Sequence, residues 1–599
     1  MVVMTAIDDY ALLSDCRTAA LVSRDGSIDW LCLPRYDSPS IFGALLGDEE
    51  HGSWQLRPVD EAALVSRRYD DGTFTLVTRW ETADGVAEVE ELLVMSPDGD
   101  PRRTDLVRRI RGVSGGVEFA QRLRMRFDYA RAVPWVRQRR QTGAPELVAI
   151  AGPDAVVLRG AALEAADHLH SGTVAVREGE LVDLSLTWFP SSDEAPAALD
   201  IDAAIGRTSE WWRGWSDRID APDVHRAQVR RSLLVLRALT HRDTGGIVAA
   251  ATTSLPEEFG GSRNWDYRFV WLRDAALTLE AFIAHGFLGI AEHWRQWLLR
   301  AIAGDPAQMQ IVYGIAGERD LWERELASLP GYEGAAPVRV GNAAAEQYQA
   351  DVIGEVLVAL DVARRAGLEE SEFSWPLQRA LLARVGDRID EPDCGIWEIR
   401  GAPRMFTHSR AMIWAALDRG IRAVNEHGLD GPVEEWERLR ERMRAEIDAQ
   451  GVAPGGWFRQ NYDDDEVDAS LLMLPSVGYC PPDDPRMIAT VERIEQTLMR
   501  DGLVHRYRTS SGVDGLPGDE HPFIACSFWL VEQYAATGRA GDAIALMDRA
   551  CALANDLGLL SEEYDVTARR HAGNTPQALS HLALVRAADA VGGAETRRG

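Results

Sequence analysis

The sequence contains no lysine, so each of its 64 basic residues is an arginine. A lysine amine forms the Schiff base of pyridoxal enzymes and of several carbonyl-dependent enzymes, and a lysine completes the phosphate-binding loop of P-loop nucleotide hydrolases. The absence of this residue therefore excludes both classes of protein.

Cysteines and long apolar runs are also scarce. The six cysteines show no CxxC spacing, so the sequence predicts buried free thiols, with neither a disulfide framework nor a zinc ribbon. No run of apolar residues approaches the roughly 18 that a membrane-spanning helix needs. Residues 1–15 lack the basic and continuous apolar segments of a secretory signal, which favours a cytoplasmic location.

The balance of charge is strongly acidic. Acidic residues outnumber basic ones by 94 to 64, which gives a formal net charge of −30. This sign opposes binding to the phosphate backbone of nucleic acids and to anionic lipid surfaces. We therefore expect neither nucleic acid nor a membrane as a partner.

A chain of 599 residues exceeds what one hydrophobic core usually organises, which favours two or more domains.

The first third of the chain has the alternation of apolar and polar residues that is typical of β-strands. In residues 117–128 the apolar side chains share one face and the charged ones, among them Arg124 and Arg126, share the other, which predicts a half-buried strand. Residues 182–188 alternate in the same way. We expect a β-sandwich over residues 1–200.

The period of the apolar residues changes after a connector. Residues 190–205 carry prolines, alanines and aspartates without strand alternation, which indicates a domain boundary. We expect a helical linker over residues 201–224. Residues 225–595 have helical spacing and are long enough for about a dozen helices, as two concentric helical rings require. Periodicity alone does not distinguish such a barrel from a solenoid, although no solenoid repeat is visible.

Three segments combine acids, arginine and tryptophan in ways that a hydrophobic core does not require. The first is NWDYRFVWLRD, residues 264–274, which runs into a predicted helix. Asp274 lies beside the helix start, where a carboxylate suits the positive end of the dipole, and Arg273 and Asp274 together suit sugar hydroxyls. A helix cap with a local ion pair explains these residues equally well.

The second segment is GIWEIRG, residues 395–401, in which one carboxylate lies among apolar and aromatic neighbours. Desolvation by such neighbours favours the neutral form of Glu398. A carboxyl group held protonated near neutral pH can donate its proton to a leaving-group oxygen, which is the general-acid half of glycoside hydrolysis. A structural ion pair between Glu398 and Arg400 is the alternative, and spacing alone favours it.

The third segment is SEEYD, residues 561–565, where three carboxylates crowd one loop. Because like charges this close repel, one of them can be shifted in pKa and serve as the general base that activates water. The alternative is a solvated acidic loop. Further on, Thr575 as N-cap and Pro576 as the first helical residue are expected to begin the last long helix.

Together and in this order, the three segments resemble glycoside hydrolase family 15, the glucoamylase and bacterial-type trehalase family. The resemblance implies an N-terminal antiparallel β-sandwich followed by an all-α (α/α)6 barrel, an α+β multidomain protein whose pocket lies among the loops at one end of the barrel. It covers nearly the full chain, through DYAL at 9–12 and DGSIDWLCLPR at 25–35, which resemble a trehalase-like N-terminal domain, and through similar stretches at 311–315, 337–342 and 525–530.

The resemblance also implies roles for single residues. Glu398 matches the general acid, Glu562 matches the general base, and Arg273 and Asp274 match the pair that grips the non-reducing glucose. The family inverts the anomeric centre, so the two carboxyl groups are expected to stand about 6.5–9.5 Å apart with a water between them. The further substrate-binding candidates are Trp265, Trp271 and Trp397, each of which could equally be a core residue, together with Tyr313 and Asn342.

The expected substrate is a small α-glucoside or α-glucan that is cut from its end. Gly395 and Ile399 stand where fungal glucoamylases have acids, so the aglycone side is expected to differ. The N-terminal motif, GIWEIRG and PVRVGN are closer to the bacterial trehalase branch. This favours α,α-trehalose narrowly over maltose, isomaltose and longer glucans.

Two other classes of function stay open. An inverting disaccharide phosphorylase would use phosphate instead of activated water, and Glu562 at a matching base position opposes it. A non-catalytic carbohydrate-binding protein is opposed by the filled acid and base positions. His168 and His170 are the only close histidine pair and lack a third ligand, so we expect no metal site and no cofactor. A homo-oligomer is compatible with the sequence.

Overall fold

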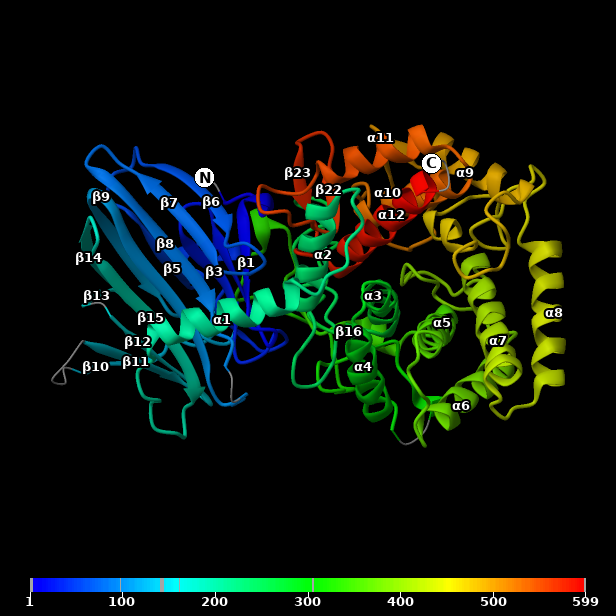
Figure 1. The fold of residues 1–599 in the computed structure, drawn as a ribbon, viewed down its shortest axis with the longest axis horizontal. Helices are drawn as coiled ribbons and strands as arrows, with labels where there is room; N and C mark the ends of the chain where they lie inside the picture. The colour runs from blue at the N-terminus through cyan, green and yellow to red at the C-terminus, as the bar shows by residue number, and fades with distance from the viewer. Residues whose placement is uncertain (1–3, 97–98, 140–144, 161, 304–305, 597–599) are drawn as a thin grey trace.

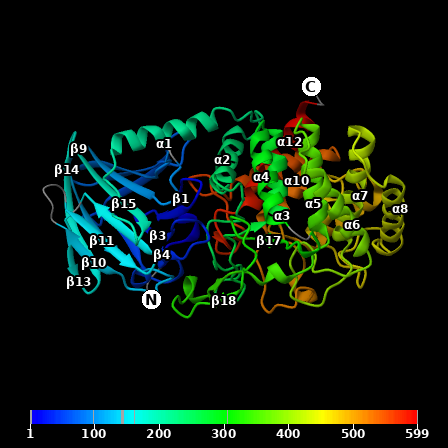
Figure 2. The same ribbon diagram turned by 90° about the horizontal axis from the view of Figure 1, so that it is seen from below.

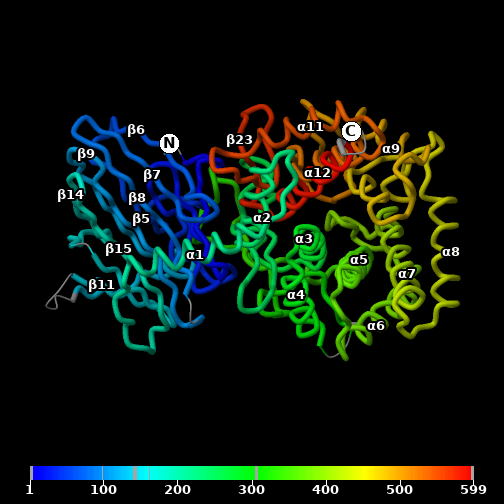
Figure 3. Tube along the Cα trace, in the orientation of Figure 1, coloured from blue at the N-terminus to red at the C-terminus, as the bar shows by residue number. Residues whose placement is uncertain are grey.

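The computed structural model describes residues 4–96, 99–139, 145–160, 162–303 and 306–596 (Figures 1 and 3). The chain forms a β-rich N-terminal part and a helical C-terminal part, which lie side by side. This arrangement confirms the predicted fold class.

Two antiparallel sheets form a sandwich in the N-terminal part and share one long strand, β9 (Thr104–Arg124). The first half of β9 pairs with β8 and β15, and its second half pairs with β5 and β14. At the crossing, Gly115 has a φ of 62°, and a Cβ there would lie 2.2 Å from the carbonyl oxygen of Asp84, so glycine is required.

The sheets are built from short strands on either side of β9. One contains β1 (Tyr10–Ser14), β2 (Ala19–Ser23), β3 (Ser27–Cys32), β4 (Ser40–Phe42), β5 (Ser53–Pro58), β13 (Glu164–Ala166) and β14 (Leu169–Arg177). The other contains β6 (Leu64–Tyr69), β7 (Leu76–Glu81), β8 (Gly85–Leu93), β10 (Trp135–Arg139), β11 (Glu146–Ala151), β12 (Asp154–Arg159) and β15 (Leu181–Pro190).

The strand predicted at residues 117–128 is the second half of β9 and the turn after it. Its apolar face is buried as expected, with Phe119 and Leu123 both 0% exposed. The prediction that the strand is half-buried is wrong at its end, because Arg124 and Arg126 are only 7% and 8% exposed. Arg124 is buried by its ion pair with Glu50 at 2.7 Å and by its hydrogen bond to the Asp167 carbonyl at 3.3 Å, in the turn between β13 and β14.

Helix α1 (Ile201–Ser216) connects the two parts and runs along the sandwich (Figures 1 and 2). It begins where the Asp200 carboxylate accepts the backbone N–H of Ala203 at 3.0 Å. Its apolar side, which includes Ala204, packs on Leu92 and Val107 of the sandwich. The expected linker therefore contains a helix, while the domain bounds at residues 200 and 225 stay a prediction.

The C-terminal part is a barrel of two helical rings within the described residues. Neighbouring inner elements contact one another in the closed order α3, α5, α7, η7, α10 and α12. The inner ring comprises α3 (Leu272–Ala284), α5 (Asp351–Arg365), α7 (Thr407–His427), η7 (Ala469–Met473), α10 (Ile524–Ala536) and α12 (Ala578–Thr596), and the outer ring α2 (Arg226–Ala238), α4 (Leu288–Ala301), α6 (Ser374–Asp387), α8 (Val433–Gln450), α9 (Pro485–Thr497) and α11 (Ala540–Cys551).

Two details of the barrel differ from an ideal (α/α)6 arrangement and from the sequence prediction. The fourth inner element, η7, is a short 3-10 helix. The last helix begins at Ala578 and not at Thr575, because the backbone N–H of Thr575 donates to Thr252 Oγ1 and that of Gln577 to the Leu560 carbonyl. Because these backbone groups bond to neighbouring loops, the residues directly before Ala578 do not join the helix.

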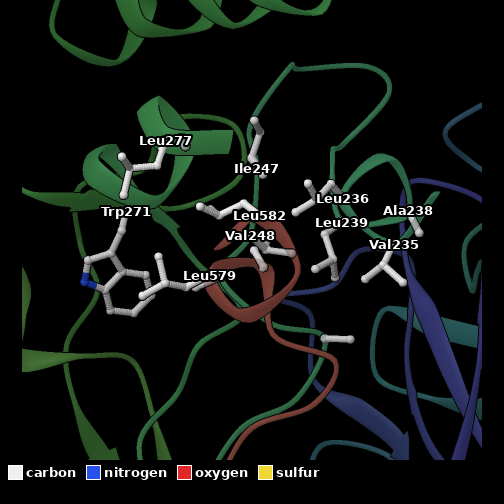
Figure 4. Packing of buried hydrophobic residues seen from close by; sticks show 14 of the residues in the cluster. Val235, Leu236, Ala238, Leu239, Ile247, Val248, Trp271, Leu277, Leu579 and Leu582 are labelled. Carbon is white, nitrogen blue, oxygen red and sulfur yellow. The ribbon is translucent and has the colours of Figure 1, made fainter. Parts of the chain in front are cut away.

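The apolar core of the barrel continues into the sandwich as one cluster. Figure 4 shows its centre, where Leu579 and Leu582 of α12 lie between Trp271 at the start of α3 and residues near the end of α2. Polar contacts join the two parts as well: the Arg268 guanidinium donates to the Ser38 carbonyl at 3.0 Å, and the Trp30 indole N–H to the Ala251 carbonyl at 3.0 Å. The sandwich therefore fixes the loop that precedes α3.

None of the helices in the described ranges combines the length and the apolar character that crossing a membrane demands.

Candidate active site

A pocket of about 840 Å³ opens among the loops at the N-terminal ends of the inner helices. Trp271, Phe523 and Gln577 each stand directly before an inner helix and line it. The remaining lining residues are Ala249, Glu257, Arg263, Trp265, Tyr267, Arg273, Asp274, Asn342, Ala344, Gln347, Ile396, Trp397, Glu398, Ile399, Arg400, Arg506, Tyr507, Asp514, Leu516 and Leu579.

Glu398 enters this pocket from a tight turn between α6 and α7. Its φ is 57°, in the left-handed region, which is uncommon outside glycine and typical of functional sites. The turn begins at Gly395, which has a φ of 65° and where a Cβ would lie 2.9 Å from the Phe406 ring. The glycine brackets seen in the sequence therefore shape the loop that presents the carboxyl group.

The surroundings of Glu398 favour its protonated form. Burial raises its pKa above the usual glutamate range, and the negative charge of Asp274 raises it further. The guanidinium of Arg273 opposes both, since its Nη2 donates to Glu398 Oε1 at 3.0 Å. The net shift is upward, as a general acid requires.

The predicted pair between Glu398 and Arg400 is absent. Arg400 instead donates to both carboxylate oxygens of Glu323, at 3.0 and 2.7 Å. The alternative explanation of GIWEIRG as a local ion pair is therefore wrong.

Arg273 and Asp274 line the pocket at the first turn of α3, as predicted. Arg273 is held from behind, because its Nη1 donates to Gln349 at 2.7 Å and to Asp351 at 3.2 Å. No side chain of the described residues donates a hydrogen bond to the Asp274 carboxylate, which is 8% exposed. It remains open to accept hydrogen bonds from a ligand's hydroxyl groups.

Glu562 lies just behind the pocket wall and is 1% exposed. Its Oε2 accepts the backbone N–H of Asn574 at 3.3 Å, and its Oε1 has no partner among the described groups. The groups that influence its pKa include Glu257, Arg506 and Tyr267, and all three line the pocket. Glu562 is not itself a lining residue, but its backbone carbonyl accepts the N–H of Ile524 at 3.0 Å, directly after Phe523 of the pocket wall.

The pKa of Tyr267 responds to both candidate catalytic carboxyls. Burial raises the pKa of its phenol, and the negative charges of Glu562 and Glu398 both raise it further. Both carboxyl groups thus act on one side chain that lines the pocket. The charges of Glu398 and Glu562 therefore both reach Tyr267, and one catalytic site shared by the two carboxyls stays a prediction.

Burial, and then the negative charge of Glu257, raise the pKa of Glu562 to about 8. Arg506 and the Tyr267 hydroxyl lower it in part. A general base works only when it is deprotonated, so the acidic limb of kcat/KM should lie well above the usual glutamate pKa of about 4.3.

We expect Glu257→Gln to move that acidic limb to lower pH. The substitution removes the negative charge that raises the pKa of Glu562, so the base stays ionised at lower pH. The measurement is the pH profile of kcat/KM on the preferred α-glucoside. Glu258→Gln is the matched control, because the same change one position along leaves Glu257 in place. An unmoved limb in Glu257→Gln would refute this account of the base.

A buried cluster of charges supports the base side of the pocket. Carboxylate oxygens of Glu257, Glu520 and Glu563 lie within 4.8 Å of one another, a spacing that a metal ion could use. Here the Arg506 guanidinium contacts all three, at 3.0, 2.6 and 3.3 Å, and Arg263 lies 3.7 and 3.5 Å from Glu257 and Glu520. Two arginines therefore already offset part of the negative charge of these carboxylates. The expected absence of a metal and a cofactor stays a prediction.

The predicted aromatic platforms differ in their environments. Trp271 and Trp397 line the pocket, and Trp397 packs edge-on against Phe523 at 5.8 Å. Trp265 also lines it, but the guanidiniums of Arg400 and Arg339 lie over its ring, 4.0 and 4.5 Å from the centroid. Because these groups occupy the indole, a ligand on this side meets Arg400 together with Trp265.

The other two predicted binding residues have structural partners. Asn342 lines the pocket, yet its amide oxygen accepts the Ala344 N–H at 2.9 Å and its amide nitrogen donates to Asp266 at 3.3 Å. Tyr313 is 0% exposed, is not among the lining residues, and its hydroxyl accepts the Gln310 N–H at 2.9 Å. The prediction for Tyr313 is corrected: it belongs to β17 (Val312–Tyr313), which pairs with the strand before α3.

Sequence reasoning missed several residues of the pocket. Tyr267 lies within NWDYRFVWLRD. Because it stands two residues after Trp265 in an extended segment, this spacing could have placed the two side chains on the same side of the chain. Glu257 and Arg506 carry no local motif. They meet across 249 positions of the chain, where Arg506 Nη2 donates to Glu257 at 3.0 Å.

Comparison with known proteins identifies the family of the chain. Residues 223–589 match the model of glycosyl hydrolases family 15, and residues 3–170 match the trehalase-like N-terminal model. The chain is similar to a trehalase of Mycolicibacterium smegmatis (38% identity, 97% of this chain and 90% of the relative) and to one of Thermoplasma acidophilum (32%, 95% and 97%). A bacterial glucoamylase solved with acarbose shares the fold, with a TM-score of 0.73 at 13% identity over 98% of this chain and 94% of that one.

The site and the fold together define a glycoside hydrolase. The chain belongs to glycosyl hydrolases family 15 and carries a trehalase-like N-terminal domain.

Proposed function

We propose that this protein hydrolyses α,α-trehalose with inversion, using Glu398 as general acid and Glu562 as general base. The observation that carries the proposal is the pocket at the N-terminal ends of the inner helices, which Glu398, Arg273 and Asp274 line, with the buried Glu562 beside Phe523 of its wall. The trehalases to which the chain is similar support the choice of substrate.

In this mechanism one glucose of the substrate lies in the pocket against Arg273 and Asp274. Glu398 donates its proton to the glycosidic oxygen while that oxygen leaves the anomeric carbon. Glu562 takes a proton from a water on the opposite face, and the water oxygen bonds to the anomeric carbon. The proton that Glu398 gives up is balanced by the proton that Glu562 takes from water, and no covalent intermediate with the protein forms.

The product anomers test this proposal directly. Inversion at one anomeric centre of α,α-trehalose gives one β-glucose, while the leaving glucose keeps its own bond and its α configuration. Proton NMR in the first turnovers, before mutarotation, should therefore show the two anomers in equal amounts. Retention would give α-glucose alone and would refute the inverting assignment.

The substrate is tested on a panel of trehalose, maltose, isomaltose, maltoheptaose and soluble starch, with and without phosphate. We expect the highest kcat/KM on trehalose. A higher value on maltose or on a glucan would move the protein to another specificity within the family. Accumulation of glucose 1-phosphate in the phosphate arm would identify a phosphorylase instead.

We also propose a cytoplasmic location and leave the homo-oligomer as a prediction. All six cysteines are free and buried, which suits a reducing compartment. The proposed domain bounds are 1–200 for the sandwich, 201–224 for the linker and 225–595 for the catalytic barrel.

A further inference from the structure

A second hollow, of about 900 Å³, opens in the N-terminal sandwich and shares no lining residue with the catalytic pocket. It lies where β13 and β14 of one sheet approach β10 and β11 of the other, at the end of the sandwich farthest from the barrel (Figure 1). Its lining residues are Met125, Arg126, Val133, Pro134, Val136, Gln138, Leu147, Leu163, Ala165, Ala166, Asp167, His168 and His170.

Arg126 brings a buried positive charge to this hollow without an acidic partner. Arg126 is 8% exposed. Its guanidinium makes one hydrogen bond to a described residue, from Nη1 to the Met125 carbonyl at 2.9 Å. The neighbouring Arg124 differs, since it pairs with Glu50 at 2.7 Å. Burial, and then the charge of Arg124, lower the pKa of Arg126, and the negative charge of Glu50, which is the ion-pair partner of Arg124, opposes them only in part. Proteins seldom bury a charge without a counter-charge, so an anion would complete this environment.

Two histidines lie on the same hollow. Asp167 and His168 form the two-residue turn between β13 and β14, with φ values of 49° and 59°, which sets His168 at the rim. His170 follows on β14, is 8% exposed, and its Nδ1 has no partner among the described residues. Burial lowers the pKa of His170, so its neutral ring offers an N–H donor at neutral pH.

The remaining wall is mainly apolar, with Gln138 as its polar residue, whose amide already donates to the Leu163 carbonyl at 3.2 Å. Val136, Leu147 and Leu163 contribute only hydrocarbon, and the described residues that line the hollow include no phenylalanine, tyrosine or tryptophan. A sugar would usually meet an aromatic platform, and a bare inorganic anion would leave these walls unused. The exposed carboxylate of Asp167 stands at the rim and disfavours a highly charged ligand. An arginine fork suits a carboxylate.

We propose that this hollow binds a small organic monocarboxylate with an apolar body, its carboxylate on Arg126 and its hydrocarbon against the walls of β10, β11 and β13. The histidines donate further hydrogen bonds to the carboxylate. This would be a second ligand site, independent of the glycosidase pocket and of the proposed substrate.

Isothermal titration of the full chain with sodium hexanoate tests the site, at constant ionic strength and with 1-hexanol as the uncharged comparison. We expect hexanoate to bind in the millimolar range or tighter and hexanol to bind more weakly. Arg126→Met should weaken hexanoate binding by at least about tenfold, because it removes the charge-assisted pair. Arg137→Met is the matched control, since Arg137 is exposed and stacks on Trp135, 3.8 Å from the ring centroid. It should bind hexanoate like the wild type.

A second variant keeps the test decisive if Arg126→Met does not fold. Val136→Glu places a carboxylate on the wall of the hollow, where it can pair with Arg126, and should abolish hexanoate binding while leaving trehalose hydrolysis unchanged. The proposal is overturned if the wild type fails to bind hexanoate, if hexanol binds as tightly, or if Val136→Glu and Arg126→Met bind hexanoate like the wild type.

Discussion

Glu398→Gln should lower kcat on trehalose by at least about two orders of magnitude, because the leaving glucose oxygen then lacks its proton donor. The amide keeps the size of the side chain and can still accept from Arg273, so the pocket should keep its shape. The measurement is kcat at the pH optimum, with circular dichroism as the check on folding.

A substrate with a good leaving group separates the acid role from a merely structural one. Fluoride leaves with little need of a proton, so Glu398→Gln should retain much more of its rate on α-glucosyl fluoride than on trehalose. Equal losses on both substrates would argue that Glu398 acts in some other way, for instance by holding Arg273.

Glu562→Gln should lose at least about two orders of magnitude on both substrates, because water activation is needed whichever group leaves. Glu563→Gln is the matched control. Its carboxylate accepts the His521 backbone N–H at 3.0 Å and lies 3.3 Å from Arg506, so it already has partners. If Glu563→Gln alone abolished activity, the base would be the second glutamate of SEEYD.

Periodicity was sufficient to predict a β-rich part followed by a helical part, because each kind of element has its own period, whereas the closed barrel was implied by the family resemblance. Alternation at residues 117–128 and 182–188 predicted strands that the structure contains as parts of β9 and β15. It did not predict that β9 serves both sheets, since strand pairing joins residues far apart. For the same reason the alternation could not reveal that the turn between β13 and β14 brings the Asp167 carbonyl to Arg124, which is buried.

The site was predictable where its chemistry is local. Glu398 and the first turn of α3 stand in short motifs, and the structure brings them together at 3.0 Å. The environment of the base was not predictable, because Glu257 and Arg506 come from distant loops and act through charge. The pKa of Glu562 depends on which charges the fold gathers around it, and no spacing within SEEYD contains that information.

Arg506→Met should have the largest effect on stability of any substitution considered. Arg506 is buried against Glu257, Glu520 and Glu563, with ion-pair distances of 3.0, 2.6 and 3.3 Å. Removing the guanidinium leaves Glu257 and Glu520 with Arg263 as their remaining close cation, and Glu563 with no ion-pair partner among the described residues. Breaking a buried pair by removing one partner typically costs about 3–5 kcal/mol, because the other charge stays buried without compensation.

The expected result is a loss of about 3 kcal/mol or more in the free energy of unfolding of the barrel, followed by tryptophan fluorescence in urea. Arg508→Met is the matched control two positions along, since Arg508 is 44% exposed and pairs with Glu466 at the surface. That change should cost no more than about 1 kcal/mol. Arg506→Lys should fall between them, because an ammonium keeps the charge but not the planar fork that reaches several carboxylates at once. If Arg506→Met were as stable as Arg508→Met, the cluster would not hold the base side of the pocket in place.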